Sequence, residues 1–185
     1  SIFGFINEVD TLLVLLVIFL LLVLGIIDDK ISIKPLSKSI VSMLIFFTFL
    51  SIRIDYQIID LRFETFNFSV DLFKLSLIFT IFCFVILQIL FNMYDGINLQ
   101  SAIYYSVILI YLILVNKNNN FSIFCSLTLI NLVFFSVYNY KQKIFLGDNG
   151  VYIFSFILSL LIIKTYQNNH TNFFVEEIII ILFIP

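Results

Sequence analysis

The sequence predicts an all-α protein whose helices cross a lipid bilayer several times. Of its 185 residues, 62% are hydrophobic and only 12% are charged, whereas a soluble domain is about 45–50% apolar and about 25% charged. The mean hydropathy is +1.13. Because a membrane-spanning helix needs about 20 mostly apolar residues, the chain has room for about seven spans. We therefore expect one polytopic transmembrane helical bundle.

Apolar runs, each taken as one helix, alternate with short polar segments along the chain. The runs cover residues 12–27, 40–50, 72–91, 97–115, 121–137 and 151–163, and a last one begins at residue 173. Pro35 and nearby lysines make the first connection a loop. Residues 53–71 are mixed in character and are expected to form the one sizeable loop. Residues 116–120 are expected to be a polar turn and residues 164–172 a polar loop that holds His170.

One polar segment lies in especially apolar surroundings, at residues 91–99 with the sequence F-N-M-Y-D-G-I-N-L. An ionised aspartate at the centre of a membrane helix costs about 2.5–3.5 kcal/mol. Asp95 is therefore expected at a membrane edge or in a polar cavity, and a functional role is its default interpretation. Gly96 permits a backbone turn that a side chain would hinder.

Acidic residues occur at the ends of alternate spans. Asp28 and Asp29 end the first run, Asp95 follows the third, and Asp148 precedes the sixth. Each span reverses the side of the membrane, so these carboxylates should lie at the same side, here called the motif side. His170 falls on the opposite side.

Positive charge gives a weaker indication of which side is cytoplasmic. The motif side holds Lys30, Lys34, Lys38, Lys141 and Lys143, and the opposite side holds Arg53, Arg62, Lys74, Lys117 and Lys164. The numbers are equal, but the motif-side lysines lie in two short loops. The positive-inside rule therefore favours a cytoplasmic motif side.

Carboxylates beside lysines at a membrane surface suit a phosphorylated substrate. Mg²⁺ takes one or two carboxylates and completes its shell with waters and substrate phosphates, while lysines can bind the remaining phosphate charge. Gly147 and Gly150 flank Asp148 and let the backbone approach a ligand closely.

Each part alone has a simpler interpretation. Asp28 and Asp29 could be solvated charges that end a helix, and residues 147–150 make a good turn sequence. Gln88 could form an interhelical hydrogen bond. Cys83 and Cys125 lie in apolar runs and are expected to pack there without a disulfide.

Three segments together resemble one enzyme family. D-D-K-I-S-I-K-P-L-S-K (28–38), N-M-Y-D-G-I-N-L (92–99) and F-L-G-D-N-G (145–150) occur in this order between apolar runs. The pattern is similar to that of the polyprenyl-phosphate N-acetylhexosamine-1-phosphate transferases of glycosyl transferase family 4. These include the phospho-N-acetylmuramoyl-pentapeptide transferase of peptidoglycan synthesis. They also include the GlcNAc-1-phosphate transferases that start lipopolysaccharide O-antigen, enterobacterial common antigen and teichoic acid.

The resemblance implies a Mg²⁺-dependent transferase in a bacterial cytoplasmic membrane, with Mn²⁺ as a possible substitute. Its substrates would be a UDP-N-acetylhexosamine and undecaprenyl phosphate, in contact with the lipid bilayer and with no nucleic acid involved; a homodimer is possible. The roles implied are catalysis for Asp28, Asp29 and Asp95, metal binding for Asp95 and Asp29, and substrate binding for Lys38, Asn92, Asp148 and Gly96. Residues 1–185 would then be a single transmembrane catalytic domain, truncated at both ends and inactive on its own.

The sequence also departs from the family pattern. Asn98 and Leu99 replace a second aspartate and a second glycine of D-G-I-D-G-L, Ile89 replaces an asparagine, and Val151 replaces a serine. Asn98 and Leu99 keep one alternative open, a non-catalytic relative of the transferases. A second alternative is an ion-coupled membrane transporter. A transporter would carry acids near the middle of its spans, whereas the acids here lie at the span ends.

Overall fold

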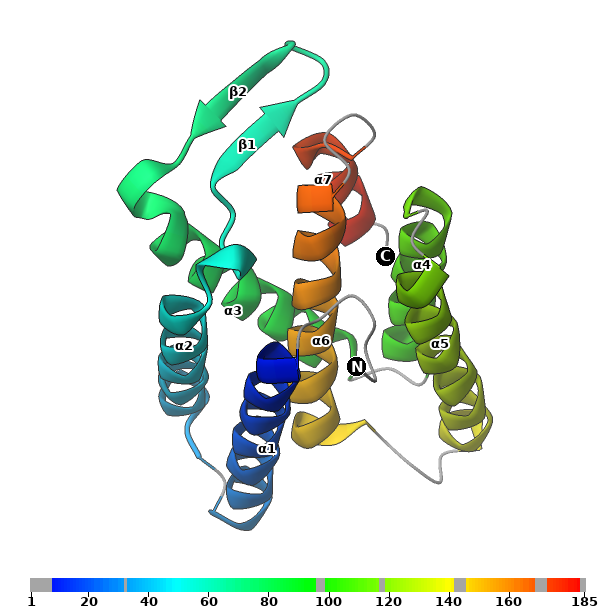
Figure 1. Cartoon of the computed structure of the whole chain (residues 1–185). Helices are drawn as coiled ribbons and strands as arrows, with labels where there is room; N and C mark the ends of the chain where they lie inside the picture. The colour runs from blue at the N-terminus through cyan, green and yellow to red at the C-terminus, as the bar shows by residue number, and fades with distance from the viewer. Residues whose placement is uncertain are drawn as a thin grey trace.

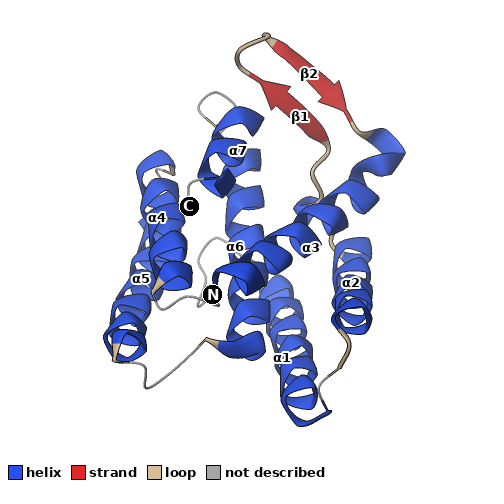
Figure 2. Ribbon diagram, turned by 180° about the vertical axis from the view of Figure 1, so that it is seen from behind, coloured by secondary structure: helices blue, strands red, loops and turns tan. Residues whose placement is uncertain are grey.

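The computed structural model describes residues 8–31, 33–95, 99–116, 119–141, 146–168 and 173–183. Within these ranges the chain is almost entirely helical, and the prediction of an all-α membrane bundle is confirmed (Figures 1 and 2). The helices are α1 (Glu8–Ile31), α2 (Pro35–Ile52), α3 (Ser76–Tyr94), α4 (Gln100–Val115), α5 (Asn119–Tyr140), α6 (Gly147–Asn168) and α7 (Val175–Phe183).

Length and composition make several of these helices candidate membrane spans. The described residues contain 5 helices long and apolar enough to cross a bilayer, namely Asp10–Ile31, Pro35–Ile52, Phe73–Tyr94, Asn120–Tyr140 and Gly147–Asn168. Helix α4 is apolar but shorter, at 16 residues. Large apolar side chains such as Leu12 and Phe19 are exposed on α1, as expected for a helix that faces lipid.

A small β-hairpin occupies the segment predicted as a loop. After the short 3₁₀ helix η1 (Ile54–Tyr56), strands β1 (Asp60–Phe63) and β2 (Phe68–Asp71) pair antiparallel. A second 3₁₀ helix, η2 (Phe73–Leu75), leads into α3. The hairpin projects from the helices in Figure 1. Four-residue strands carry too little alternation to be separated from a polar loop by pattern alone.

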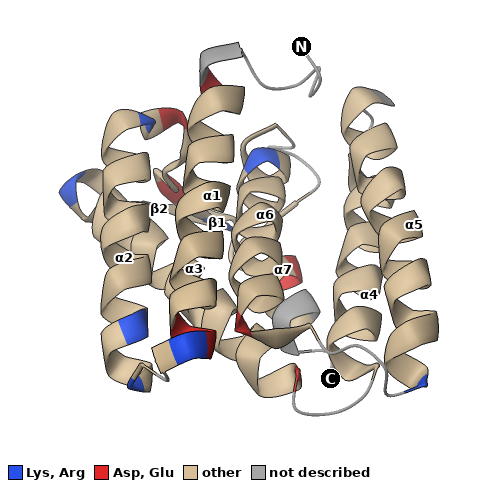
Figure 3. Cartoon of the chain, turned by 90° about the horizontal axis from the view of Figure 1, so that it is seen from below, with Lys and Arg blue, Asp and Glu red and all other residues tan. Residues whose placement is uncertain are grey.

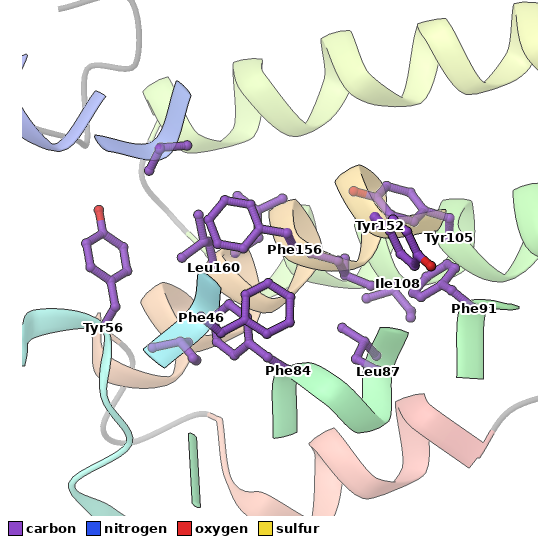
Figure 4. Packing of buried hydrophobic residues seen from close by; sticks show 14 of the residues in the cluster. Phe46, Tyr56, Phe84, Leu87, Phe91, Tyr105, Ile108, Tyr152, Phe156 and Leu160 are labelled. Atoms are coloured by element: carbon purple, nitrogen blue, oxygen red, sulfur yellow. The ribbon is translucent and has the colours of Figure 1, made fainter. Parts of the chain in front are cut away.

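Helix α6 lies between α1 and α3, and α2 packs against both of these. Aromatic rings fill the centre of the four-helix unit (Figure 4): the Phe46 ring centroid is 5.2 Å from that of Phe84 and 5.9 Å from that of Phe156. These three rings come from α2, α3 and α6 and are buried. Cys83 and Cys125 form no disulfide, as the sequence predicts. The packing fixes the N-terminal end of α6 in the middle of one end of the bundle.

Helices α4 and α5 pack mainly against each other and lie beside this unit (Figure 1). Aromatic rings connect α4 to α3. The ring centroid of Phe91 on α3 is 5.4 Å from those of Tyr104 and Tyr105 on α4. Leu99 directly precedes α4 as its N-cap residue, and its N–H donates to Asn139 Oδ1 on α5 at 2.6 Å.

Candidate functional site

The motif segments meet at one end of the bundle, as the alternation of spans predicts. Figure 3 shows acidic and basic segments gathered at the lower ends of α1, α2 and α6. Direct contacts connect these elements, and they also connect α3 to α6. The prediction that the acidic segments share one end is therefore confirmed, and the contacts below describe the site that they form.

Lys38, on the first turns of α2, joins two of the motif segments. Its Nζ atom lies 2.9 Å from Asp28 Oδ2 on α1 and 2.5 Å from Asp148 Oδ2 on α6. Asn92 on α3 approaches the other oxygen of Asp148, with a distance of 3.5 Å from Nδ2 to Oδ1. A single ammonium group thus connects side chains of three helices, while a fourth contributes through Asp148. Since an ammonium has three donors, one N–H remains for another acceptor.

The neighbouring aspartates Asp28 and Asp29 have different surroundings. Asp28 is buried, and its second oxygen, Oδ1, accepts the N–H of Ile33 at 2.8 Å. Asp29 is exposed, and its Oδ2 accepts from Nδ2 of Asn149 at 2.9 Å. Helix α1 continues through both residues, and consecutive helical side chains point about 100° apart. Asp28 therefore faces Lys38, whereas Asp29 stays accessible to a ligand.

Two residues that the sequence reasoning did not single out, Gly25 and Asn149, bring α1 close to α6. A Cβ atom placed on Gly25 would lie 2.9 Å from the Cα of Asn149 and closer still to its side chain. Only glycine therefore allows Asn149 to approach α1 and reach Asp29. A lone glycine within an apolar helix is a recognisable signal of close helix packing in membranes.

Asp95, at the C-terminal end of α3, interacts with the start of α6. Its Oδ2 accepts the N–H of Gly147 at 3.0 Å, and its Oδ1 accepts from Ser101 Oγ at 3.3 Å. The free N–H groups of a helix N-terminus favour such a negative partner. Burial raises the pKa of Asp95, while these hydrogen bonds oppose that change. Gly147 has φ +64°, a left-handed conformation that suits glycine.

Some predicted site residues lie outside the described ranges. These are Gly96, expected to bind substrate, Asn98, which replaces the family's second aspartate, and His170. Leu99 is described, and it has φ +67°. The family's second glycine belongs at this position, and the left-handed conformation gives a physical reason for glycine there. Val151, in place of a serine, is buried.

The donor set fits a hydrated magnesium ion better than an ion enclosed by protein. Among the described residues no group of three or more His, Cys, Asp or Glu side chains comes close enough to hold a metal. Mg²⁺ needs only one or two carboxylates because it retains waters and takes substrate oxygens. Asp29 is exposed and Asp95 is partly exposed, so both have the right chemistry and access.

One comparison with known proteins gave a match, to a family. The family model described as glycosyl transferase family 4 matches residues 11–166. This range includes all three motif segments and every contact described above. A search of curated proteins found no match.

Proposed function

This chain belongs to glycosyl transferase family 4 and so to the polyprenyl-phosphate sugar-1-phosphate transferases in general; from that premise we propose its substrates and its site. The donor is a UDP-N-acetylhexosamine and the acceptor is undecaprenyl phosphate. The enzyme transfers HexNAc-1-phosphate to the lipid and releases UMP. The reaction takes place at the cytoplasmic face of a bacterial cytoplasmic membrane.

The observation that carries this proposal is the cluster around Lys38. Asp28, Asp148 and Asn92 come from three different helices and meet beside this one ammonium group at an end of the bundle. Asp29 and Asp95 complete the set of carboxylates at the same end. A transporter would instead need such groups within its spans.

The transfer does not need a strong general base. A phosphate monoester has its second pKa near 6, so the lipid phosphate is largely ionised at neutral pH. One of its oxygens forms a bond to the β-phosphorus of the UDP-sugar. The bond from that phosphorus to the oxygen bridging the two phosphates breaks, and UMP leaves with this oxygen. The main obstacle is the approach of two negatively charged groups.

Different residues would hold the metal ion and position the phosphate groups. Asp29 and Asp95 would hold Mg²⁺, or Mn²⁺ in its place, and the ion would neutralise phosphate oxygens. Asp28 holds Lys38 in place from its buried position. The remaining N–H of Lys38 would bind a phosphate oxygen of the substrate, and Asn92 and Asp148 would position that group. Gly96 is proposed to let the backbone approach the substrate.

The test is a reaction with purified full-length protein in detergent. UMP should appear only when undecaprenyl phosphate, Mg²⁺ and a UDP-N-acetylhexosamine are all present, and EDTA should stop its release. Several UDP-sugars are compared because the sugar is part of the proposal. Absence of UMP with every one of them would contradict the proposed activity.

A further inference from the structure

A cavity lies beside the Lys38 cluster, between α2, α3 and α6. Its volume is about 290 Å³, which is at the small end for ligand pockets. It can therefore hold one ring or one head group but not a whole nucleotide sugar. Its polar lining comes from Lys38, Ser39, Gln88, Asn92 and Tyr152.

Gln88 gives the cavity a specific chemical requirement. Its side chain lines the cavity, yet the residue is only 4% exposed. Within the described part of the chain, its Oε1 atom has no hydrogen-bond partner, so no interhelical bond is made through this oxygen. A buried carbonyl oxygen without a partner is costly. The position therefore suits a ligand that brings an O–H or N–H group.

The charge around the cavity favours a neutral ligand over a phosphate. Lys38 already has two carboxylates, Asp28 and Asp148, as partners, so this cluster of three groups has one net negative charge. The other polar groups that line the cavity are neutral. A phosphate dianion that entered the cavity without a metal ion would be repelled by this net negative charge, whereas a neutral group with several hydrogen-bond donors would not. The lipid phosphate is therefore the poorer candidate for this cavity.

We propose that this cavity binds the sugar ring of the nucleotide sugar, and that Gln88 Oε1 accepts a hydrogen bond from a ring hydroxyl or from the acetamido N–H. The inference rests on the proposed function and extends it, because it assigns a sugar-recognition residue. Asn92 connects the two parts of the site, since it lines the cavity and also contacts Asp148. The diphosphate then extends from the cavity towards the exposed Asp29 and Asp95.

The test compares two probes, UDP-GlcNAc and UDP, on the full-length protein in detergent with Mg²⁺. Gln88→Leu and Gln88→Met remove the acceptor at nearly constant size. Each should weaken UDP-GlcNAc binding about 10-fold, the effect of one hydrogen bond, and leave UDP binding unchanged. Gln167→Leu is the matched control, because Gln167 lies at the other end of α6 and donates to Gln57 O. It should change neither affinity.

The outcomes separate this inference from the proposed function. If the unmodified protein binds neither probe, the proposed function fails and the sugar site fails with it. If it binds both, but the Gln88 variants weaken both equally or neither, the sugar site alone is wrong. Undecaprenyl phosphate is measured as a third probe on the same variants. A selective loss of its binding would assign the cavity to the lipid and likewise overturn the inference.

Discussion

At the scale of single residues, Lys38 is the side chain that holds the site together. Two carboxylates share its ammonium, and the side chain of Asp28 is only 6% exposed. Removal of one member of a buried ion pair leaves an uncompensated charge, which is far more costly than loss of a surface pair. The stability of the end of the bundle where the motif segments meet therefore depends on this one cation.

Lys38→Met should lower the free energy of unfolding by about 2–3 kcal/mol, a value reduced for the partial exposure of Asp148. Adding Asp148→Asn should restore part of this loss, because the double variant has one fewer unpaired charge. Thermal unfolding in detergent measures both. Lys74→Met, at an exposed lysine, is the control and should change stability by less than about 0.5 kcal/mol. If Lys38→Met and Lys74→Met lowered the free energy of unfolding equally, this role of Lys38 would be contradicted.

A second prediction concerns Leu99, where a substitution by glycine is not expected to destabilise the protein. A side chain in the left-handed region costs about 1–2 kcal/mol, and glycine avoids that cost but adds freedom to the unfolded chain. Leu99→Gly should thus leave stability unchanged or raise it by up to about 1 kcal/mol. In contrast, Leu114→Gly within α4 should be destabilising by about 1 kcal/mol. Loss of stability in both variants would argue against the left-handed conformation.

The sequence predicts part of the site at this scale and misses another part. Asp28, Asp95 and Asp148 could be brought together because each span reverses direction, which is a property of chain order alone. Asn149 could not be assigned to Asp29, since that contact depends on which helix faces which. The different surroundings of Asp28 and Asp29 also follow from packing, because the two residues are identical in the sequence.

At the scale of elements, the site depends on how closely α1 and α6 approach. Apolar runs predict both helices, but the observed helices extend beyond the runs into the polar motifs. Helix α1 ends at Ile31, and α6 starts at Gly147. Asp28, Asp29 and Asp148 consequently lie on helix turns rather than in loops, and Asp95, which follows the end of α3, supplies a partner for the N-terminus of α6. The hairpin was missed because its strands are short.

Gly25→Ala tests this close approach. The added Cβ would meet the backbone of Asn149, so α1 and α6 must separate and the bond from Asn149 to Asp29 should be lost. We expect at least a 10-fold loss of transferase activity and a lower unfolding temperature. Gly150→Ala is a useful comparison, because its Cβ meets only the flexible Leu146 side chain and should be tolerated better. Full activity in Gly25→Ala would contradict the inferred packing.

At the scale of the whole molecule, two different parts of the bundle have different tasks. The unit of α1, α2, α3 and α6 is joined by aromatic rings at its centre and carries the ionic groups at one end. Helices α4 and α5 lie beside it: Ser101 on α4 donates to Asp95, and Asn139 on α5 accepts the N–H of Leu99. Composition predicts such a bundle in a membrane, but it cannot predict this division, which arises from long-range packing.

The central claim is that the helices bring separate carboxylates to one phosphate-transfer site. The most direct measurement is UMP release by the full-length Asp95→Asn variant, with Asp71→Asn on strand β2 as the matched control. We predict that Asp95→Asn lowers the rate at least about 100-fold while the protein remains folded, and that Asp71→Asn keeps the normal rate. Activity that survives in Asp95→Asn, and again after Asp28→Asn is added, would contradict the account.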